Sequence, residues 1–503
     1  MPRERGGAGW FEWGLLALFA VLLGLVTWRH EMWIDEMQAW LIARDSHSLA
    51  ALFHQLHYEG HPALWYLLLY IPAHLSANAA VMQAMNYAVA VALAWSIVSE
   101  PKLPRTTRAL AIFGYYVFYR YGAIARSYEL GVLLLMGAAR CLMGERQHRR
   151  LGLALLALAI NTHVFAGPVA VALGVWAFGL AKLKTWRDAG RLPRDREFWT
   201  AIAVLAVSGL ASLATVWPAP DIAPVAQAHG AGSGAWLGGA FLSSGSAAWQ
   251  MFVPHLPARV QLMVKPLYAY SLTACSFSLA VFAVATGLLR TARARGFFAA
   301  CAAMEIALMA VTVRWPDVYH FGFLFAAYVI AVLMDAYAAP GEHGLRWMPR
   351  RAAAVLLPAV LAVQVLAGAD VTALDWMRPY SGAKEVSTWL KSRHLEGNPL
   401  VLEPSEFTTA IVGYLQRRAA YYPSCRCFGS FEVRNNRRNE WRMATAEDLR
   451  AARGDSRLPV ILVSHERLTA AEARGLGVVE VHATRQDAVQ EDEDFFIYEQ
   501  AQR

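Results

Sequence analysis

The amino-acid sequence predicts a multi-span α-helical membrane protein with a small soluble α/β domain at its C-terminal end. Of its 503 residues, 57% are hydrophobic and only 17% are charged. The apolar residues gather in blocks such as Trp10 to Trp28, Ala80 to Val98 and Ala352 to Ala369. A helix of about 20 such residues spans a bilayer core about 30 Å thick. Because the blocks stop near residue 370, we expect a transmembrane domain over 1–370 and a soluble domain over 371–503.

The first apolar block follows two arginines, but its length and the lack of a small-residue cleavage pattern favour an uncleaved first helix. Further spans are expected at about 80–98, 109–119, 127–143, 151–162, 164–181, 198–217, 264–289, 297–313, 320–339 and 352–370. The remaining apolar stretch, 61–75, decides the topology. If it does not span, the basic clusters between the blocks all lie on the side of the N-terminus. We therefore expect about eleven spans, with 61–75 as a re-entrant or interfacial helix.

The net charge of +8 is explained by these basic clusters, because lysine and arginine accumulate in cytoplasmic loops. Nucleic acid is therefore not an expected partner. We expect a bacterial inner (plasma) membrane protein with a cytoplasmic N-terminus and a periplasmic C-terminal domain. Four regions then face outward: 29–79, 120–126, 218–263 and the tail from about 371.

The tail alternates short helical and strand patterns, which is typical of a small α/β domain. Helices are expected over Gly382 to Arg393 and Phe407 to Arg418, and strands over Leu400 to Leu402, Pro459 to Val463 and Phe495 to Tyr498. Cys425 and Cys427 lie two apart in this tail. Their spacing leaves free thiols, a local disulfide and weak metal binding open.

An acidic pair, Asp35 and Glu36, follows the first span within the segment Trp33 to Trp40. Apolar residues of this segment recur on one helical face, so it is expected to lie in the membrane interface. A carboxylate there can act as general base on an acceptor hydroxyl. An ordinary solvated acidic loop is the competing interpretation.

The sequence Glu59-Gly60-His61-Pro62 follows in the same loop and opens an apolar run. The spacing of His57, Glu59 and His61 is not that of a structural zinc site. Pro62 is typical of the first turn of a helix.

Together, the acidic pair and Glu59-Gly60-His61-Pro62 resemble the first-loop pattern of the GT-C glycosyltransferase superfamily, in its bacterial mannosyltransferase-like branch. This branch is similar to protein O-mannosyltransferases and aminoarabinose transferases. Ala63 departs from the pattern, where a second proline is expected. The segments Ala125 to Leu130, Pro379 to Lys384 and Tyr421 to Pro423 are also similar to the family, although less specifically.

The resemblance implies an inverting, hexosyltransferase-type transfer of a sugar from a polyprenyl-phosphate-linked donor to an acceptor hydroxyl on a glycan, lipid or protein at the outer face. It implies that the first-loop aspartate, Asp35, is the base or a metal-binding carboxylate. A divalent cation such as Mg or Mn is left open, and no other cofactor is expected. The membrane lipid itself is an expected partner.

The departing lipid phosphate requires positive charge near the outer surface. Arg126, Lys265 and Arg314 lie at outward helix ends, where snorkelling to the interface is the alternative role. Glu129 is either a second acidic residue of the site or the ion-pair partner of Arg126, and the second role is favoured. His61, His163 and His320 can bind sugar or phosphate, although a helix-end histidine such as His163 or His320 is often merely hydrogen-bonded.

The loop 218–263 is rich in small residues and contains Trp236, Trp249, Pro254 and His255, which suits a segment that covers a substrate. Two other classes of function compete with the transferase. A flippase for a lipid-linked saccharide predicts internal repeats, which the sequence does not show. A non-catalytic assembly subunit predicts that Asp35 is dispensable.

Overall fold

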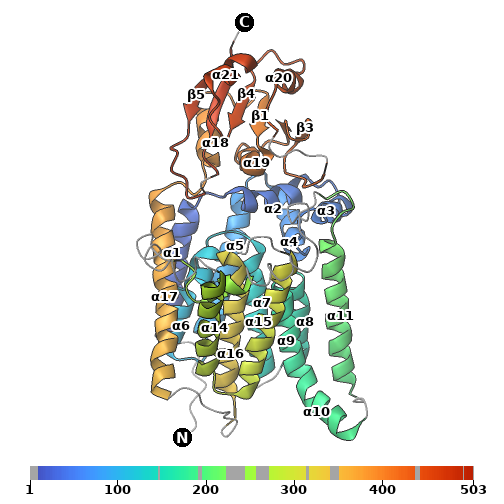
Figure 1. Cartoon of the computed structure of the whole chain (residues 1–503), viewed down its shortest axis with the longest axis vertical. Coiled ribbons are helices and arrows are strands. Elements are labelled where there is room, and N and C mark those ends of the chain that lie inside the picture. Colours follow the sequence, from blue (N-terminus) through green and yellow to red (C-terminus); the bar gives the residue numbers. More distant parts are fainter. Residues whose placement is uncertain are drawn as a thin grey trace.

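The computed structural model describes residues 9–144, 148–190, 195–222, 244–255, 271–312, 317–339, 350–436, 442–490 and 492–501. A helical bundle occupies one part, and a sheet with short helices lies at one end of it (Figure 1). The elements of the first part are α1 (Trp10–Arg29), α2 (Ile34–Asp45), α3 (Leu49–Leu56), α4 (Leu64–Leu75), α5 (Ala80–Val98), α6 (Arg105–Ile112), η1 (Tyr115–Arg120), α7 (Ser127–Met143), α8 (Arg149–Ile160), α9 (Ala166–Gly174), η2 (Val175–Gly179), α10 (Leu180–Ala189), α11 (Arg196–Val216), η4 (Ala248–Met251), α14 (Ser271–Leu288), α15 (Ala292–Thr312), η5 (Val318–Phe321), α16 (Gly322–Tyr337) and α17 (Arg350–Met377).

Six helical segments among the described residues are long and apolar enough to cross a membrane: α1, α5, α11, α15, η5 with α16, and most of α17. Large apolar side chains are exposed along them, including Val21, Val207 and Leu366, whose exposed fractions are 61, 67 and 69%. Runs of exposed apolar side chains are stable where lipid covers them. The prediction of a multi-span helical membrane protein is thereby confirmed. The count of eleven spans stays a prediction, because the other apolar helices are shorter.

The helices follow most of the apolar blocks, with three main differences. The helix expected over 164–181 contains the π-helical segment η2 and continues as α10 to Ala189. The expected span at 109–119 is divided, because α6 ends at Ile112 and the π-helical segment η1 begins at Tyr115. The last helix of the bundle, α17, continues to Met377 instead of ending at 370. Its final turns contain Asp375, which the hydropathy pattern treats as a stop but which the structure buries beside His30.

The C-terminal part is a six-stranded mixed sheet in the order β3-β2-β1-β4-β6-β5. β1 pairs in parallel with β2 and β4, and the other pairs are antiparallel. Every residue of β1 and β4 is buried, as expected for central strands covered on both faces. The elements are α18 (Ala383–Ser392), β1 (Leu400–Glu403), α19 (Ser405–Tyr414), β2 (Ala420–Tyr422), β3 (Cys427–Gly429), α20 (Ala446–Arg453), β4 (Ile461–Ser464), α21 (Ala470–Leu476), β5 (Val478–Ala483) and β6 (Phe496–Gln500).

The first-loop helix α2 lies between the bundle and the sheet domain (Figure 1). α19 packs on it so closely that a Cβ on Gly413 would overlap the sulfur of Met37. The backbone N–H of Ile34 donates to Glu493 Oε1 at 3.0 Å. At the other end of α2, Arg418 and Asp45 form an ion pair of 2.8 Å. The acidic pair is therefore held at the junction of the two parts.

Candidate active site

Asp35 lies in the first turn of α2, where the helix dipole favours a negative charge. Its carboxylate accepts a hydrogen bond from Arg126 Nη1, and the exposed fractions of the two side chains are 23 and 13%. Burial alone would raise the pKa of Asp35, but Arg126, and then Arg434 and His61, outweigh it and hold the pKa below its ordinary value. Asp35 is therefore ionised at neutral pH.

The Asp35–Arg126 pair lines an open cavity of about 400 Å³ where the bundle meets the sheet domain. Charged side chains contribute part of its lining, and rings contribute much of the rest. The lining residues are Asp35, Glu59, Gly60, His61, Arg126, Tyr128, His163, Val164, Phe165, Thr312, Tyr319, His320 and Arg434. A polar cavity with two carboxylates, two guanidinium groups and an aromatic wall suits a substrate that has both anionic and sugar parts.

Glu59 is a second carboxylate of the cavity, and it belongs to the first-loop pattern, although no catalytic role was predicted for it. Gln38 Nε2 donates to Glu59 Oε1 at 2.9 Å, and the Tyr66 hydroxyl donates to Oε2 at 3.4 Å. Burial raises the pKa of Glu59, and the Gln38 hydrogen bond and the Arg434 charge only partly oppose it. The pKa values of Asp35 and Glu59 are thus moved in opposite directions, which is a common arrangement for groups that share acid–base work.

Arg434 reaches the cavity from the sheet domain, and sequence reasoning missed it. Its guanidinium lies 3.9 Å from Glu432 Oε2, and 45% of the side chain is exposed. The backbone on which it stands is fixed by Gln38: Nε2 donates to the Glu432 carbonyl at 2.7 Å, and the Glu432 N–H donates to Oε1 at 3.0 Å. One glutamine of α2 therefore holds both Glu59 and the segment that carries Arg434.

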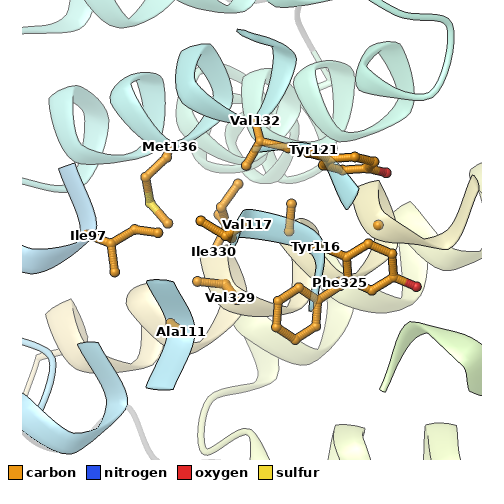
Figure 2. A pocket seen from close by; sticks show the side chains of 12 residues that line it. Ile97, Ala111, Tyr116, Val117, Tyr121, Val132, Met136, Phe325, Val329 and Ile330 are labelled. Carbon is orange, nitrogen blue, oxygen red and sulfur yellow. The ribbon is translucent and has the colours of Figure 1, made fainter. Parts of the chain in front are cut away.

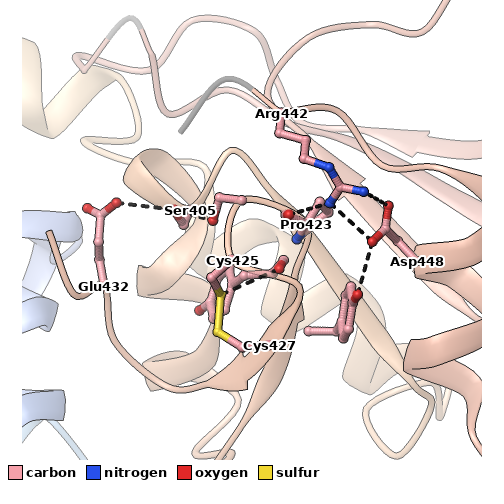
Figure 3. Close-up of a disulfide and its surroundings, with 10 residues drawn as sticks. Ser405, Pro423, Cys425, Cys427, Glu432, Arg442 and Asp448 are labelled. Carbon is pink, nitrogen blue, oxygen red and sulfur yellow. Dashed lines mark hydrogen bonds and ion pairs between the residues drawn. A yellow bond between two sulfur atoms is a disulfide. The ribbon is translucent and has the colours of Figure 1, made fainter. Parts of the chain in front are cut away.

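The segment that carries Arg434 follows a disulfide between Cys425 and Cys427. Of free thiols, a local disulfide and weak metal binding, which the spacing left open, the structure thus has the disulfide. Figure 3 shows the disulfide beside Ser405, whose hydroxyl donates to Glu432 Oε1 at 3.1 Å. The disulfide lies in the turn between β2 and β3, and the chain continues from β3 to Glu432. Together these contacts stiffen the segment before Arg434.

Glu36 points away from this cavity into a buried network, although the sequence placed it beside Asp35 as a candidate catalytic group. Its Oε1 accepts from the Ala125 N–H at 2.6 Å, and its Oε2 lies 2.9 Å from His30 Nε2. His30 Nδ1 lies 2.8 Å from Asp375 Oδ2. Burial alone would lower the pKa of His30, but Glu36 and Asp375 raise it to about 10. This network fixes the residue before Arg126.

The favoured role of Glu129 as the partner of Arg126 is wrong. Arg126 pairs with Asp35 and contacts His61, whereas Glu129 is fully buried in the first turn of α7. Neither of its carboxylate oxygens has a hydrogen-bond partner among the described residues. Residues three apart share a face only within a helix, whereas Arg126 precedes α7 as its N-cap and has an extended backbone, so its side chain turns away from Glu129.

Of the remaining predicted site residues, His61 and His320 both line the cavity. Lys265 and Arg314 lie outside the described residues, as does most of the loop 218–263. Within 244–255, His255 Nε2 lies 2.9 Å from Asp370 Oδ2.

The cavity is separate from a small apolar void of about 20 Å³ within the bundle, which Figure 2 shows. The rings of Tyr116 and Tyr121 line this void, and their hydroxyls bind the η5 backbone. Tyr121 donates to the Tyr319 carbonyl at 2.6 Å, and Tyr116 donates to the Val318 carbonyl at 3.1 Å. These bonds position η5, which supplies Tyr319 and His320 to the active-site cavity.

No group of three or more His, Cys, Asp or Glu side chains within the described part of the chain is arranged to hold a metal ion. In the cavity, Arg126 contacts both Asp35 and His61. The guanidinium therefore occupies the position between the two side chains that a cation would need.

The chain matches no model of a protein family, and no curated protein matches it either. Its fold is similar to a cryo-EM structure of a mutant arabinofuranosyltransferase AftD from mycobacteria, at 16% sequence identity and a TM-score of 0.38. The likeness covers 99% of this chain, which spans 42% of the length of that protein. A likeness at this level decides neither the family nor the activity.

Proposed function

We propose that the chain is a membrane glycosyltransferase of the GT-C type, which transfers a sugar from a polyprenyl-phosphate-linked donor to an acceptor hydroxyl at the outer face. The observation that carries the proposal is the Asp35–Arg126 pair in a cavity between the helix ends and the sheet domain. At this place a lipid-linked donor in the bilayer and a polar acceptor outside it can meet. The first-loop sequence pattern supports the same reaction.

In the proposed step, the acceptor oxygen attacks the anomeric carbon and its proton passes to the Asp35 carboxylate. The bond from the anomeric carbon to the phosphate oxygen breaks, and polyprenyl phosphate leaves with the electron pair, which inverts the anomeric centre. Arg126 and Arg434 stabilise the negative charge that develops on the phosphate. Because the phosphate competes with Asp35 for Arg126, donor binding weakens the ion pair and makes the carboxylate available.

Glu59 is an alternative general base that can accept the proton of the acceptor hydroxyl. Its raised pKa brings it closer to neutral pH, where a general base is most effective. If Glu59 is the base, Glu59→Gln loses transfer while Asp35→Asn, which frees Arg126 for the donor phosphate, keeps most of it.

The test is sugar transfer by purified protein in proteoliposomes from labelled polyprenyl-phosphate donors, with Asp35→Asn compared with wild type. We expect transfer to fall about 10²–10⁴-fold with donor binding retained. Asp45→Asn is the matched control, because Asp45 ends the same helix far from the cavity lining. A chelator is expected to leave transfer unchanged, since the arginines supply the positive charge.

Equal transfer by wild type and Asp35→Asn would remove Asp35 from the mechanism. Movement of the lipid-linked sugar across the bilayer without transfer would favour the flippase instead. Loss of binding to an assembly partner, with no transfer in any variant, would favour the non-catalytic subunit.

The orientation in the membrane is part of the proposal. Disulfides persist mainly in oxidising compartments such as the bacterial periplasm. The Cys425–Cys427 bridge therefore supports a periplasmic sheet domain and an outward-facing cavity in the inner membrane.

A further inference from the structure

Two histidines of the cavity have a defined protonated nitrogen. His61 Nε2 lies 3.1 Å from Arg126 Nη2. A guanidinium can only donate, so Nε2 accepts and the proton of the neutral ring is on Nδ1. Burial, and then the charge of Arg126, lower the pKa of His61 to about 3, so the ring is neutral at physiological pH.

His163 has the opposite tautomer. The backbone N–H of Phe165 donates to His163 Nδ1 at 3.2 Å. Nδ1 therefore accepts, and in the neutral ring Nε2 carries the proton. The side chain follows the end of α8 and is almost fully buried, with an exposed fraction of 1%.

The protonated nitrogen of each ring, His61 Nδ1 and His163 Nε2, has no hydrogen-bond partner among the described residues. Buried donors without a partner are uncommon, and a missing ligand or water is the usual cause. Both residues line the cavity, and their ring centroids are 5.1 Å apart. The two rings that carry these unsatisfied donors are thus neighbours in the cavity wall.

The surroundings of these donors favour a neutral, hydroxyl-rich ligand over an anion. The ring of Tyr128, which lines the cavity, lies 4.4 Å from that of His163, whereas the buried Phe323 stacks on His163 from behind the lining at 5.3 Å. Aromatic rings with neutral hydrogen-bond donors can contact both the apolar faces and the hydroxyls of a sugar. The phosphate of the same substrate is better placed at the two arginines, which carry charge.

We propose that His61 and His163 form the sugar subsite of the cavity, with His61 Nδ1–H and His163 Nε2–H donating to oxygen atoms of the transferred sugar. This inference rests on the proposed function. In these tautomers neither His61 Nδ1 nor His163 Nε2 can bind a metal ion, because each carries a proton and has no free lone pair.

The test uses two amide replacements of the same histidine. A glutamine amide nitrogen can occupy the place of Nε2, whereas the shorter asparagine reaches only the place of Nδ1. We expect His163→Gln to keep donor KM close to that of wild type. We expect His163→Asn to raise donor KM about tenfold, the loss expected for one buried hydrogen bond.

Binding is measured separately by quenching of tryptophan fluorescence, with prenyl phosphates that carry mannose, arabinofuranose or no sugar. Wild type and His163→Gln are expected to bind one sugar-bearing probe more tightly than the sugar-free probe, and His163→Asn is expected to bind both equally. Sugar-dependent binding without transfer would overturn the proposed function and leave the subsite in place. The subsite is overturned if wild type does not distinguish the probes or if the two variants behave alike.

Discussion

The central residue of the cavity is Arg126, because one guanidinium serves two neighbours. Nη1 binds Asp35 and Nη2 donates to His61, and its charge lowers the pKa of both groups. The same side chain thus keeps the carboxylate ionised and fixes the tautomer of the imidazole. A lysine, with a single ammonium group, cannot reproduce this planar geometry.

We therefore expect Arg126→Lys to keep the protein folded but to lower kcat/KM for the donor about 10- to 100-fold, the effect of about 1.4–2.8 kcal/mol. The measurement is the transfer assay together with the melting temperature in detergent. Arg418→Lys is the control, since that arginine has an exposed fraction of 75% and pairs with Asp45 at the other end of α2. Equal activity of the two lysine variants would contradict this role of Arg126.

Among single residues, Asp35, Arg126 and His61 could be predicted from the sequence as site residues, because each belongs to a recognisable local pattern near a helix end. Nothing in the sequence selected Arg434, whose neighbours in the chain carry no motif. The cavity contains Arg434 only because the sheet domain docks on α2, and one sequence does not reveal such contacts between distant segments.

Among the elements, α2 connects the two parts of the molecule through Gln38. This side chain binds the backbone of Glu432 on both its N–H and its carbonyl side, and it also binds Glu59. The disulfide and the Ser405 hydrogen bond hold the far side of the same segment. The place of Arg434 is therefore set by contacts of its neighbours and not by a strong ion pair of its own.

We expect Gln38→Leu to lower transfer about as much as Arg434→Ala, because it removes the contacts that hold the Arg434 segment against the cavity. It leaves the polar groups of Glu432 without their partners, so a loss of about 1–3 kcal/mol in stability is also expected. Arg434→Ala is expected to lower activity with little change in melting temperature, because the side chain is 45% exposed.

The double variant separates the two effects. If Gln38 acts through Arg434, Gln38→Leu adds little to the loss of activity already caused by Arg434→Ala. Independent, multiplying losses would show that Gln38 acts on the reaction mainly through Glu59.

At the scale of the whole molecule, apolar block length was enough to predict most of the bundle. α5 begins and ends where its block does, and the strands β1, β4 and β6 follow the expected segments. β2, β3 and β5 were not predicted: β2 and β3 have only three residues each, and β3 and β5 are the edge strands, so all three depend on their neighbours more than on their own pattern. The break between α6 and η1 also escaped prediction, because hydropathy does not distinguish α-helical from π-helical turns.

Docking of the sheet domain on the first loop depends on Glu493, and this contact is expected to respond to pH. Glu493 accepts from the Ile34 N–H at 3.0 Å and from the Ser381 hydroxyl at 2.5 Å. Burial raises its pKa to about 8 from an ordinary value of 4.5, and Asp35 and Glu36 act in the same direction. The folded protein therefore holds this proton more tightly than the unfolded chain does. As pH rises from about 4.5 to about 8, Glu493 makes a decreasing contribution to stability.

Glu493→Gln stays uncharged over this whole range, so its melting temperature is expected to fall less than that of wild type between pH 5 and 8. The absolute melting temperature of the variant is expected to be lower, because an amide nitrogen replaces one acceptor oxygen. His30, whose pKa is raised to about 10, also stabilises less as pH rises above about 6.5, but it does so in both proteins and cancels in the comparison. Glu447→Gln on the exposed face of α20 is the control for a lost surface charge. Parallel curves for wild type and Glu493→Gln would show that the docking contact does not titrate, and the sheet domain would then hold Arg434 at the cavity equally well across this pH range.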